Sequence, residues 1–347
     1  MEHVAVIGAG AFGTALAAVI GKKGHKVSLW SFNEEACREI NENRINKTYL
    51  PGVELPETIT AYTGLEETME GAGYMILATP SLFTVSTMKQ LLTYPTILEG
   101  EVKIATVAKG FLPGKNGPEL IVDALENYLP GSYKGNLVYI SGPSHAEEVG
   151  RGKITGLISA SLNANNSILY RELLAGDSIK IFSSLDVVGV QTCAAIKNVV
   201  AIAFGVLDAM KDQEGDIVGD NTESLLFAAG LNEIQTLGRA LGSTHPETFT
   251  SIAGVGDLDV TCRSVYGRNR RFGREIITKD IIGKYKSIED LLENIKDIPY
   301  LPEGVFAARH AMELIEKHNL KLPLITSVYK ILNKEAERDL VKSIFTL

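Results

Sequence analysis

The stretch "HVAVIGAGAFGTALAAVIGKKGHKVSLWS", residues 3–31, predicts a strand, a glycine-rich turn, a helix and a second strand. The apolar run 3–7 forms the first strand, and residues 26–31 form the second. Between them, residues 11–23 have the spacing of a helix that carries small residues. A complete strand–helix–strand unit at the start of the chain indicates an α/β domain with parallel strands.

Three glycines of the turn, Gly8, Gly10 and Gly13, form the pattern G-x-G-x-x-G. The first permits a tight turn, the second lets the backbone approach a pyrophosphate, and the third lets helix and strand pack closely. Ala11 and Phe12 open the helix, whose N-terminal N–H groups and positive dipole end can bind phosphate oxygens. Within a complete βαβ unit, this pattern predicts a site for a dinucleotide, NAD or NADP, rather than an empty turn.

Further apolar runs continue the alternation of strands and helices. Strands are expected at 74–80, 103–110, 136–143 and 155–161, with helices at 81–92 and 117–129. This predicts a doubly wound, mostly parallel sheet whose ligands bind outside the carboxyl ends of the strands. Three strand ends carry distinctive residues: Pro80-Ser81, Lys109-Gly110 and Ser141-Gly-Pro-Ser144. Turn chemistry alone explains the glycines and prolines but not Lys109.

The second half of the chain is predicted to be helical. Helical patterns occur at 187–210, 222–241, 288–296, 303–318 and 324–337. We therefore expect a dinucleotide-binding domain over residues 1–186 and an all-α domain over residues 187–347. The run 187–210 is apolar nearly all round, which is typical of a central core helix and, given its polar interruptions, less so of a membrane span.

Lys197 and Asn198 interrupt this apolar helix. Lys197 shares its face with small residues such as Ala194 and Ala201, which leave room for a small ligand above the ammonium group. Asn198 is rotated by about 100° and can border the same space. Burial disfavours the charged amine and lowers its pKa, which suits a group that exchanges protons near neutral pH. The alternative is a lysine at the helix edge that reaches the solvent.

The next polar cluster, "AGVGDLDVTCRSVYGRNRRFG", covers residues 253–273. It contains Asp257, Asp259 and Thr261, and by residue 274 it supplies five arginines: Arg263, Arg268, Arg270, Arg271 and Arg274. Guanidinium groups bind phosphate bidentately, so the cluster predicts a phosphate site. A nucleic-acid patch is a rival interpretation that the short extent of the cluster weakens, and a solvated helix face accounts for some of the arginines.

Composition limits the function classes. The chain has 347 residues, 45% of them hydrophobic, which predicts about two domains. A formal net charge of −8 argues against general binding to nucleic acid or anionic membranes. Cys37, Cys193 and Cys262 are widely spaced and lack metal-ligand spacing, and because residues 3–7 already form a strand we expect no signal peptide. We expect reduced thiols, no metal and a cytoplasmic location.

Short motifs in a characteristic order run along nearly the whole chain. They are "GAGAFGTALA", "YLPG", "PS" at 80–81, "AKGF", "SGPSHAEEV", "AAIKNV", "GDN", "AGVGDL", "TC", "RNRRFG" and "PEG". Together they resemble the NAD(P)-dependent glycerol-3-phosphate dehydrogenases of the bacterial type. The resemblance implies a Rossmann domain followed by an all-helical domain, commonly paired as a homodimer. It also implies reversible reduction of dihydroxyacetone phosphate by NADH or NADPH, to supply glycerophospholipid synthesis.

The resemblance also implies roles for individual residues. Lys197 is the general acid/base with Asp257 close to it, and Arg268 and Asn269 hold the substrate phosphate, with Arg268 also near the cofactor. Lys109 lies where substrate and nicotinamide meet. The other expected positions are Gly142, Ser144, Asn198 and Thr261 at the substrate, and Ala146, Leu301 and Glu303 at the cofactor.

Two departures from the family pattern affect these expectations. A serine often precedes the Arg-Asn pair, whereas this chain has Gly267, whose backbone N–H could replace the hydroxyl. Many members have a basic residue after the second strand, where this chain has Ser31, Phe32 and Asn33. Ser31 and Asn33 can bond a ribose hydroxyl or a phosphate, and Phe32 can pack beside adenine. Tyr49 lies nearby, in a segment that we also expect on the adenine side of the site. With no carboxylate at the strand end, we expect both NADH and NADPH to be accepted.

Two rival functions stay open on the sequence alone. A β-hydroxyacid dehydrogenase combines a Rossmann domain, a helical domain and a catalytic lysine, but its substrate ends in a carboxylate, and the crowded "GRNRR" cluster favours phosphate. A redox-sensing dinucleotide-binding module without catalysis would have no need of a buried Lys197.

Overall fold

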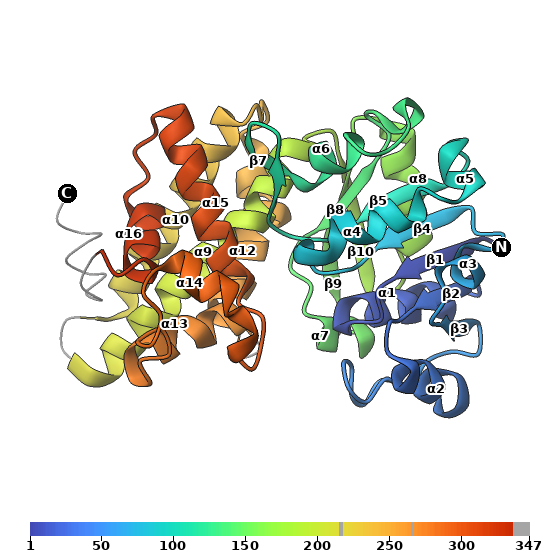
Figure 1. Cartoon of the computed structure of the whole chain (residues 1–347), viewed down its shortest axis with the longest axis horizontal. Helices are drawn as coiled ribbons and strands as arrows, with labels where there is room; N and C mark the ends of the chain where they lie inside the picture. Colours follow the sequence, from blue (N-terminus) through green and yellow to red (C-terminus); the bar gives the residue numbers. More distant parts are fainter. Residues whose placement is uncertain (215–217, 265–266, 336–347) are drawn as a thin grey trace. The chain divides into compact units, whose positions relative to one another are not determined.

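The computed structural model describes residues 1–214, 218–264 and 267–335 (Figure 1). The chain folds into two compact units. Unit 1 contains residues 1–109 and 121–187, and unit 2 contains residues 110–120 and the chain from residue 188 onward. We expected one division, into residues 1–186 and 187–347. The structure differs in residues 110–120, which belong to unit 2.

An eight-stranded sheet forms the centre of unit 1, with the strand order β10-β9-β8-β5-β4-β1-β2-β3. Its strands are β1 (His3–Ile7), β2 (Lys26–Trp30), β3 (Ile59–Tyr62), β4 (Tyr74–Leu77), β5 (Lys103–Thr106), β8 (Val138–Ser141), β9 (Thr155–Ala160) and β10 (Ile179–Ser184). Neighbouring strands are parallel except for the pair β8 and β9. The predicted doubly wound, mostly parallel sheet is confirmed, and the carboxyl ends of β1, β4, β5 and β8 lie at one edge of it.

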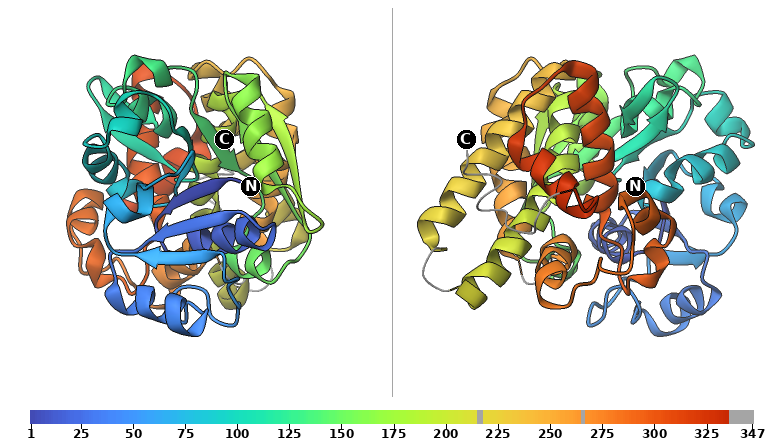
Figure 2. Two further views of the ribbon diagram at one scale, coloured as in Figure 1. Left: turned by 90° about the vertical axis from the view of Figure 1, so that its right-hand side faces the viewer. Right: turned by 60° about the vertical axis from the view of Figure 1, so that its left-hand side comes forward.

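Helices cover both faces of this sheet (Figure 2). Consecutive residues of a strand point to opposite faces, and every residue from Val4 to Ile7 is fully buried, so neither face of β1 reaches the solvent. The helices of unit 1 are α1 (Ala11–Lys22), α2 (Glu34–Asn43), α3 (Leu65–Met69), α4 (Ser81–Leu91), α5 (Pro95–Leu98), α6 (Ile121–Glu126), η1 (Gly131–Tyr133), α7 (Ala146–Gly150) and α8 (Ala164–Leu174). The predicted helix over 117–129 is wrong at its start, because residues 117–120 form a strand of unit 2.

Unit 2 is built around α9 (Val187–Glu214), which is long and apolar enough to cross a membrane but has 94% of its apolar window buried inside the protein. That burial is typical of a core helix. The other elements are the hairpin β6 (Phe111–Gly114) and β7 (Gly117–Leu120), and the helices α10 (Asp220–Ala240), α11 (Glu247–Thr250), α12 (Asp257–Arg263), α13 (Arg268–Thr278), α14 (Ile288–Glu293), α15 (Glu303–His318) and α16 (Pro323–Leu332), with the short turns η2 (Ile252–Gly256) and η3 (Ile295–Asp297).

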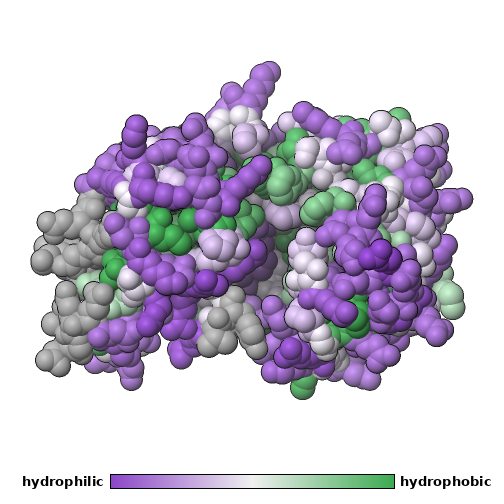
Figure 3. Space-filling model, turned by 60° about the horizontal axis from the view of Figure 1, so that its bottom comes forward, coloured by the Kyte–Doolittle hydropathy of each residue, from purple (hydrophilic) through white to green (hydrophobic). Residues whose placement is uncertain are grey.

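The hairpin belongs to unit 2 because its apolar residues enter that core. Phe111 and Leu120 are buried in the same apolar cluster as α9, and the Phe111 ring packs edge-on against His310 of α15. Residues 336 and 337 of the predicted helix 324–337 lie outside the described residues, and α16 ends at Leu332. Polar and charged side chains cover most of the surface seen in Figure 3, with apolar residues in small patches.

Candidate functional site

The glycine turn between β1 and α1 fits a bound pyrophosphate. Gly8 has a φ of +125°, and a Cβ there would lie 2.9 Å from the Ala78 carbonyl group. A Cβ at Gly13 would lie 1.9 Å from the Gly8 carbonyl oxygen, so α1 can approach β1 this closely only with glycine. Around Gly10, no heavy atom of the described chain lies within 4 Å of the position a Cβ would take. This open space adjoins the N-terminus of α1, where the first N–H groups can bind an anion.

Other residues of the motif line or support this turn. Ala11 and Phe12, in the first turn of α1, are half-buried. Behind the turn, the fully buried Asn46 donates a hydrogen bond to the Ala9 carbonyl oxygen over 3.0 Å. Nothing in the pattern "NRINKTYLPG" distinguishes this asparagine from an ordinary turn residue, so the sequence did not point to it.

The segment after β2 holds its polar side chains within the fold. Ser31 is only 2% exposed, and its hydroxyl accepts a hydrogen bond from the Asn33 N–H over 3.1 Å. The Asn33 side chain caps α2 by accepting from the Ala36 N–H over 3.2 Å. Phe32 is 75% exposed, as packing against an adenine ring would require. Of the three residues, Phe32 is therefore the one whose side chain is largely exposed.

The nearby cations are also engaged. Arg38 pairs with Glu35 over 2.5 Å, and Lys47 lies 3.8 Å from Glu39. The Arg44 guanidinium donates to the Ile59 carbonyl oxygen over 2.7 Å. Exposed ion pairs such as that of Arg38 are weak, so a ligand phosphate can compete for this arginine.

The ends of β5 and β8 contribute the remaining predicted residues of unit 1. Lys109 is half-buried just beyond β5. Gly142, just beyond β8, has a φ of +123°, and a Cβ there would lie 2.9 Å from the Gly156 carbonyl oxygen. The Ser144 hydroxyl donates to the Gly142 carbonyl oxygen over 2.9 Å. Ala146 is the first residue of α7 and is buried. These residues follow parallel strands β5 and β8, so they lie at the same sheet edge as the glycine turn.

In unit 2, Lys197 and Asn198 lie inside the protein, each only 5% exposed. This burial excludes the alternative of a lysine that reaches the solvent. The Lys197 Nζ donates a hydrogen bond to Oδ1 of Asp257, which is fully buried at the start of α12. A buried ammonium group needs such a partner, because an unpaired charge is strongly disfavoured away from water. The apolar helix therefore carries a buried ion pair rather than an isolated cation.

Contacts lead from this pair to the start of α13. The Thr261 hydroxyl donates to the Asp257 carbonyl oxygen over 2.6 Å. A Cβ at Gly267 would lie 3.3 Å from the Thr261 carbonyl oxygen, so Gly267 packs directly beside α12. The Gly267 N–H donates to the Ser264 carbonyl oxygen over 3.2 Å, so it is engaged within the chain, and its role in place of a serine hydroxyl stays a prediction. The N–H groups that face outward in this region are those of the first turn of α13.

A second path returns from α13 to α9. The Asn269 side-chain oxygen accepts a hydrogen bond from the Gly304 N–H over 2.9 Å, and the guanidinium of Arg268 lies 3.9 Å from the carboxylate of Glu303. Gly304 packs against α9, since a Cβ on it would lie 2.6 Å from the Asn198 carbonyl oxygen. The half-buried Leu301 packs against the core just before α15. These contacts connect all the predicted residues of unit 2 except Leu301: Lys197, Asn198, Asp257, Thr261, Gly267, Arg268, Asn269 and Glu303.

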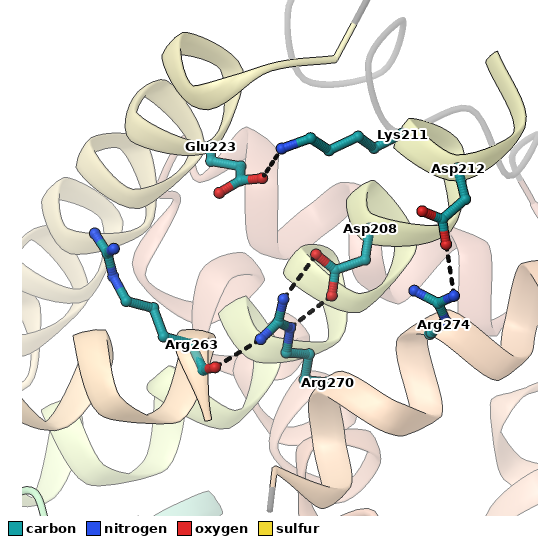
Figure 4. A network of polar contacts seen from close by, with 7 residues as sticks. All are labelled: Asp208, Lys211, Asp212, Glu223, Arg263, Arg270 and Arg274. Atoms are coloured by element: carbon teal, nitrogen blue, oxygen red, sulfur yellow. Dashed lines mark hydrogen bonds and ion pairs between the residues drawn. The ribbon is translucent and has the colours of Figure 1, made fainter. Parts of the chain in front are cut away.

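The five arginines of residues 263–274 differ in their partners, and Figure 4 shows three of them, Arg263, Arg270 and Arg274. Arg270 makes a bidentate pair with Asp208 of α9 over 2.5 and 2.9 Å, and Arg274 pairs with Asp212 over 2.5 Å. Arg263 pairs with Asp259, and Arg271 with Glu275, over 2.6 and 3.0 Å. Arg268 is 57% exposed, and the ion pair it makes within the described chain is the distant one with Glu303. Arg268 is therefore the arginine best placed to bind an added phosphate.

Two other titratable groups of unit 2 have shifted pKa values. Burial raises the pKa of the Cys262 thiol far above its usual range, so the thiol stays protonated. Burial also acts to raise the pKa of Glu275, but hydrogen bonds from Tyr300, Lys279 and Arg271 outweigh it and lower that pKa. Within the described part of the chain, no three His, Cys, Asp or Glu side chains are grouped as a metal site.

Comparison with known proteins covers both units. The models of the NAD-dependent glycerol-3-phosphate dehydrogenase N-terminus and C-terminus match residues 3–167 and 186–342. A glycerol-3-phosphate dehydrogenase (NAD(P)+) of Treponema denticola is 55% identical over 350 residues, which cover 99% of this chain and 98% of that protein. The corresponding protein of Bacillus mycoides is 36% identical over 348 residues, covering 99% and 95%.

Solved structures show the same relationship. A glycerol-3-phosphate dehydrogenase from Coxiella burnetii has a TM-score of 0.85 and 30% sequence identity to this protein, covering 100% of this chain and 99% of that chain. A D-mandelate dehydrogenase with a TM-score of 0.56 is only 13% identical, which shows a shared fold alone. The chain belongs to the NAD-dependent glycerol-3-phosphate dehydrogenase family.

Proposed function

We propose that the protein is an NAD(P)-dependent sn-glycerol-3-phosphate dehydrogenase that reversibly reduces dihydroxyacetone phosphate. The observation that carries this proposal is the cluster of unit 2, in which the buried Lys197–Asp257 pair is connected through Thr261 and α13 to Arg268. A proton donor and a phosphate-binding group belong to one connected set of contacts. A small phosphorylated carbonyl compound needs both.

Lys197 supplies the proton in this scheme. When bound, the reduced nicotinamide supplies the hydride to the ketone carbon. The Lys197 ammonium transfers one proton to the ketone oxygen, which becomes the new hydroxyl, and the amine then regains a proton from water. Asp257 holds Nζ in place through its Oδ1 and offsets the charge of the ammonium. The positive charge of Lys197 also stabilises negative charge on the oxygen, so the scheme needs no metal ion.

Arg268 and the N-terminus of α13 hold the phosphate. A phosphate at this end of an 11-residue helix meets outward N–H groups and the positive end of the helix dipole. The Asn269 side-chain oxygen already accepts from Gly304, so its Nδ2 is the group that can donate to the ligand. The forked guanidinium of Arg268 adds charge and geometry suited to a phosphate.

Cofactor oxidation with matched substrates tests the proposal. The expected result is turnover of dihydroxyacetone phosphate with NADH or NADPH, weak turnover of dihydroxyacetone, and none of 2- or 3-oxoacids. Preference for an oxoacid would identify a β-hydroxyacid dehydrogenase. Stoichiometric cofactor binding without turnover of any carbonyl compound would identify a sensing module instead.

The broader setting belongs to the same proposal. The family resemblance supports a cytoplasmic homodimer that provides sn-glycerol 3-phosphate for glycerophospholipids, and the net charge of −8 argues against binding to anionic membranes. Light scattering of the full chain tests the dimer: a single monomeric species across working concentrations would contradict it. The domain division near residue 186 is supported by the gap between the two family matches, 3–167 and 186–342.

A further inference from the structure

Asn46 lies fully buried in unit 1, between the glycine turn and the segment that carries Tyr49. Its Nδ2 donates to the Ala9 carbonyl oxygen over 3.0 Å and to the Thr14 hydroxyl over 2.9 Å. Its Oδ1 accepts from the Tyr49 N–H over 3.2 Å. A carbonyl oxygen can only accept and an N–H can only donate, so these partners determine the orientation of the amide. Asparagine supplies both functions, whereas aspartate or alanine supplies at most one.

The contact with Ala9 orients the backbone of the glycine turn. The Thr14 hydroxyl also donates to the Ala9 carbonyl oxygen, over 3.2 Å, so two side chains draw this oxygen toward the interior. The chain has no cis peptide bond among its described residues, and the two polar groups of a trans peptide point in opposite directions. The Gly10 N–H therefore points away from Asn46. Gly10 borders the open space beside the turn, where this N–H can serve a ligand.

The Oδ1 of Asn46 holds the segment around Tyr49, which is expected on the adenine side of the site. Besides the contact with the Tyr49 N–H, the backbone oxygen of Asn46 accepts from the Leu50 N–H over 2.9 Å. One residue thus joins two segments that are separated by more than 30 positions in the sequence, the turn at Ala9 and the segment at Tyr49. These segments are the ones expected to meet the pyrophosphate and the adenosine part of a dinucleotide.

We propose that Asn46 is a positioning residue for the cofactor: it sets the spacing between the pyrophosphate turn and the adenosine segment, and it orients the Gly10 N–H. This inference rests on the dinucleotide site of the proposed function. It predicts a loss of cofactor affinity without a loss of substrate affinity, because Asn46 belongs to unit 1 and the phosphate cluster belongs to unit 2.

The test compares Asn46→Ala with Asn41→Ala. Asn41 is a matched control, since its side chain also makes two backbone hydrogen bonds in unit 1, both to Ala61, over 2.9 and 2.8 Å. It contacts neither the glycine turn nor Tyr49 in these bonds. Two lost hydrogen bonds at the turn should raise the Kd for NADH and for ADP-ribose about tenfold or more in Asn46→Ala. The Kd of Asn41→Ala should stay within about twofold of the parent protein.

Direct binding keeps this inference separate from the proposed reaction. NADH fluorescence titration measures cofactor affinity whether or not dihydroxyacetone phosphate is turned over, and the KM for dihydroxyacetone phosphate should change less than about twofold. If Asn46→Ala does not fold, Thr14→Val removes one donor to the Ala9 oxygen and should raise the Kd about threefold. Unchanged NADH affinity in a folded Asn46→Ala protein, or an equal loss in Asn41→Ala, would overturn the inference.

Discussion

The buried pair of Lys197 and Asp257 predicts that Lys197→Met loses both activity and stability. Methionine keeps the bulk of the lysine stem and removes the proton donor. General acid/base catalysis contributes about 10²–10⁴-fold, so kcat should fall by at least this order. The same change leaves the carboxylate of Asp257 buried without its partner, because the two side chains are only 6% and 1% exposed.

The stability loss can be worked from this burial. Removing one partner of a buried ion pair destabilises a protein by about 3–5 kcal/mol. For a domain of the size of unit 2, that corresponds to a decrease in Tm of roughly 6–20 °C. The double variant Lys197→Met/Asp257→Asn has no buried charge at this position and should recover at least half of the loss. Its activity should stay as low as that of the single variant.

Calorimetry and cofactor oxidation on the same preparations make the comparison, with Lys211→Met as the control. Lys211 lies on the same helix and pairs with Glu223 over 3.0 Å, but its side chain is 41% exposed. Its removal should change Tm little and leave kcat unchanged. Near-parent turnover by Lys197→Met would refute the acid/base role. Equal Tm values for the parent and Lys197→Met would refute the reasoning from the buried pair.

Three further predictions concern Arg268, the choice between NADH and NADPH, and Glu233. Arg268→Ala should raise the KM for dihydroxyacetone phosphate at least tenfold and leave kcat/KM for dihydroxyacetone almost unchanged. The control Arg270→Ala should instead lower Tm, because it loses the ion pair with Asp208. An equal loss of kcat/KM on both substrates in Arg268→Ala would contradict a phosphate contact. The kcat/KM values for NADH and NADPH should differ less than about a hundredfold, because no carboxylate ends β2 and Phe32 discriminates poorly at the 2′ position of the ribose. Steady-state kinetics at matched ionic strength measure both values. A thousandfold preference for either cofactor would reveal an unidentified contact with the 2′ position. Burial raises the pKa of Glu233 to about 7 from 4.5, so its contribution to stability is fully present below pH 4.5 and is lost as the pH rises through 7. In urea unfolding, the free energy of unfolding should therefore fall by about 1–3 kcal/mol over this interval in the parent protein but not in Glu233→Gln. If this free energy had the same pH dependence in both proteins, Glu233 would not be the cause.

Local patterns were sufficient for much of unit 1. The first strand has the predicted bounds, and α1 differs from the expected helix by one residue, because hydrophobic periodicity and the glycine pattern are properties of adjacent residues. The same holds for α15, predicted and observed at 303–318. The buried position of Lys197 also followed from its neighbours, since a helix that is apolar on every side has nowhere to expose a lysine.

Segments whose structure depends on distant partners were predicted less well. Residues 117–120 have a helical pattern but form β7, because they pair with β6 and pack on α15 in unit 2.

The polar residues of the candidate site could be named from the sequence, but the partner of each one could not be predicted. Five arginines within twelve residues have the same charge and the same forked shape, so composition cannot rank them. The fold places Asp208 and Asp212 of α9 against Arg270 and Arg274 and leaves Arg268 exposed. Likewise, a lone asparagine at position 46 has no local pattern: its bond with the Tyr49 N–H is local, but its bonds to the Ala9 oxygen and the Thr14 hydroxyl exist only once the glycine turn packs against this segment. Periodicity and glycine spacing determine which elements form, because they act over a few residues. Long-range partners of buried polar groups, such as Asp257 for Lys197, are decided by tertiary packing, because they join residues that are far apart along the chain.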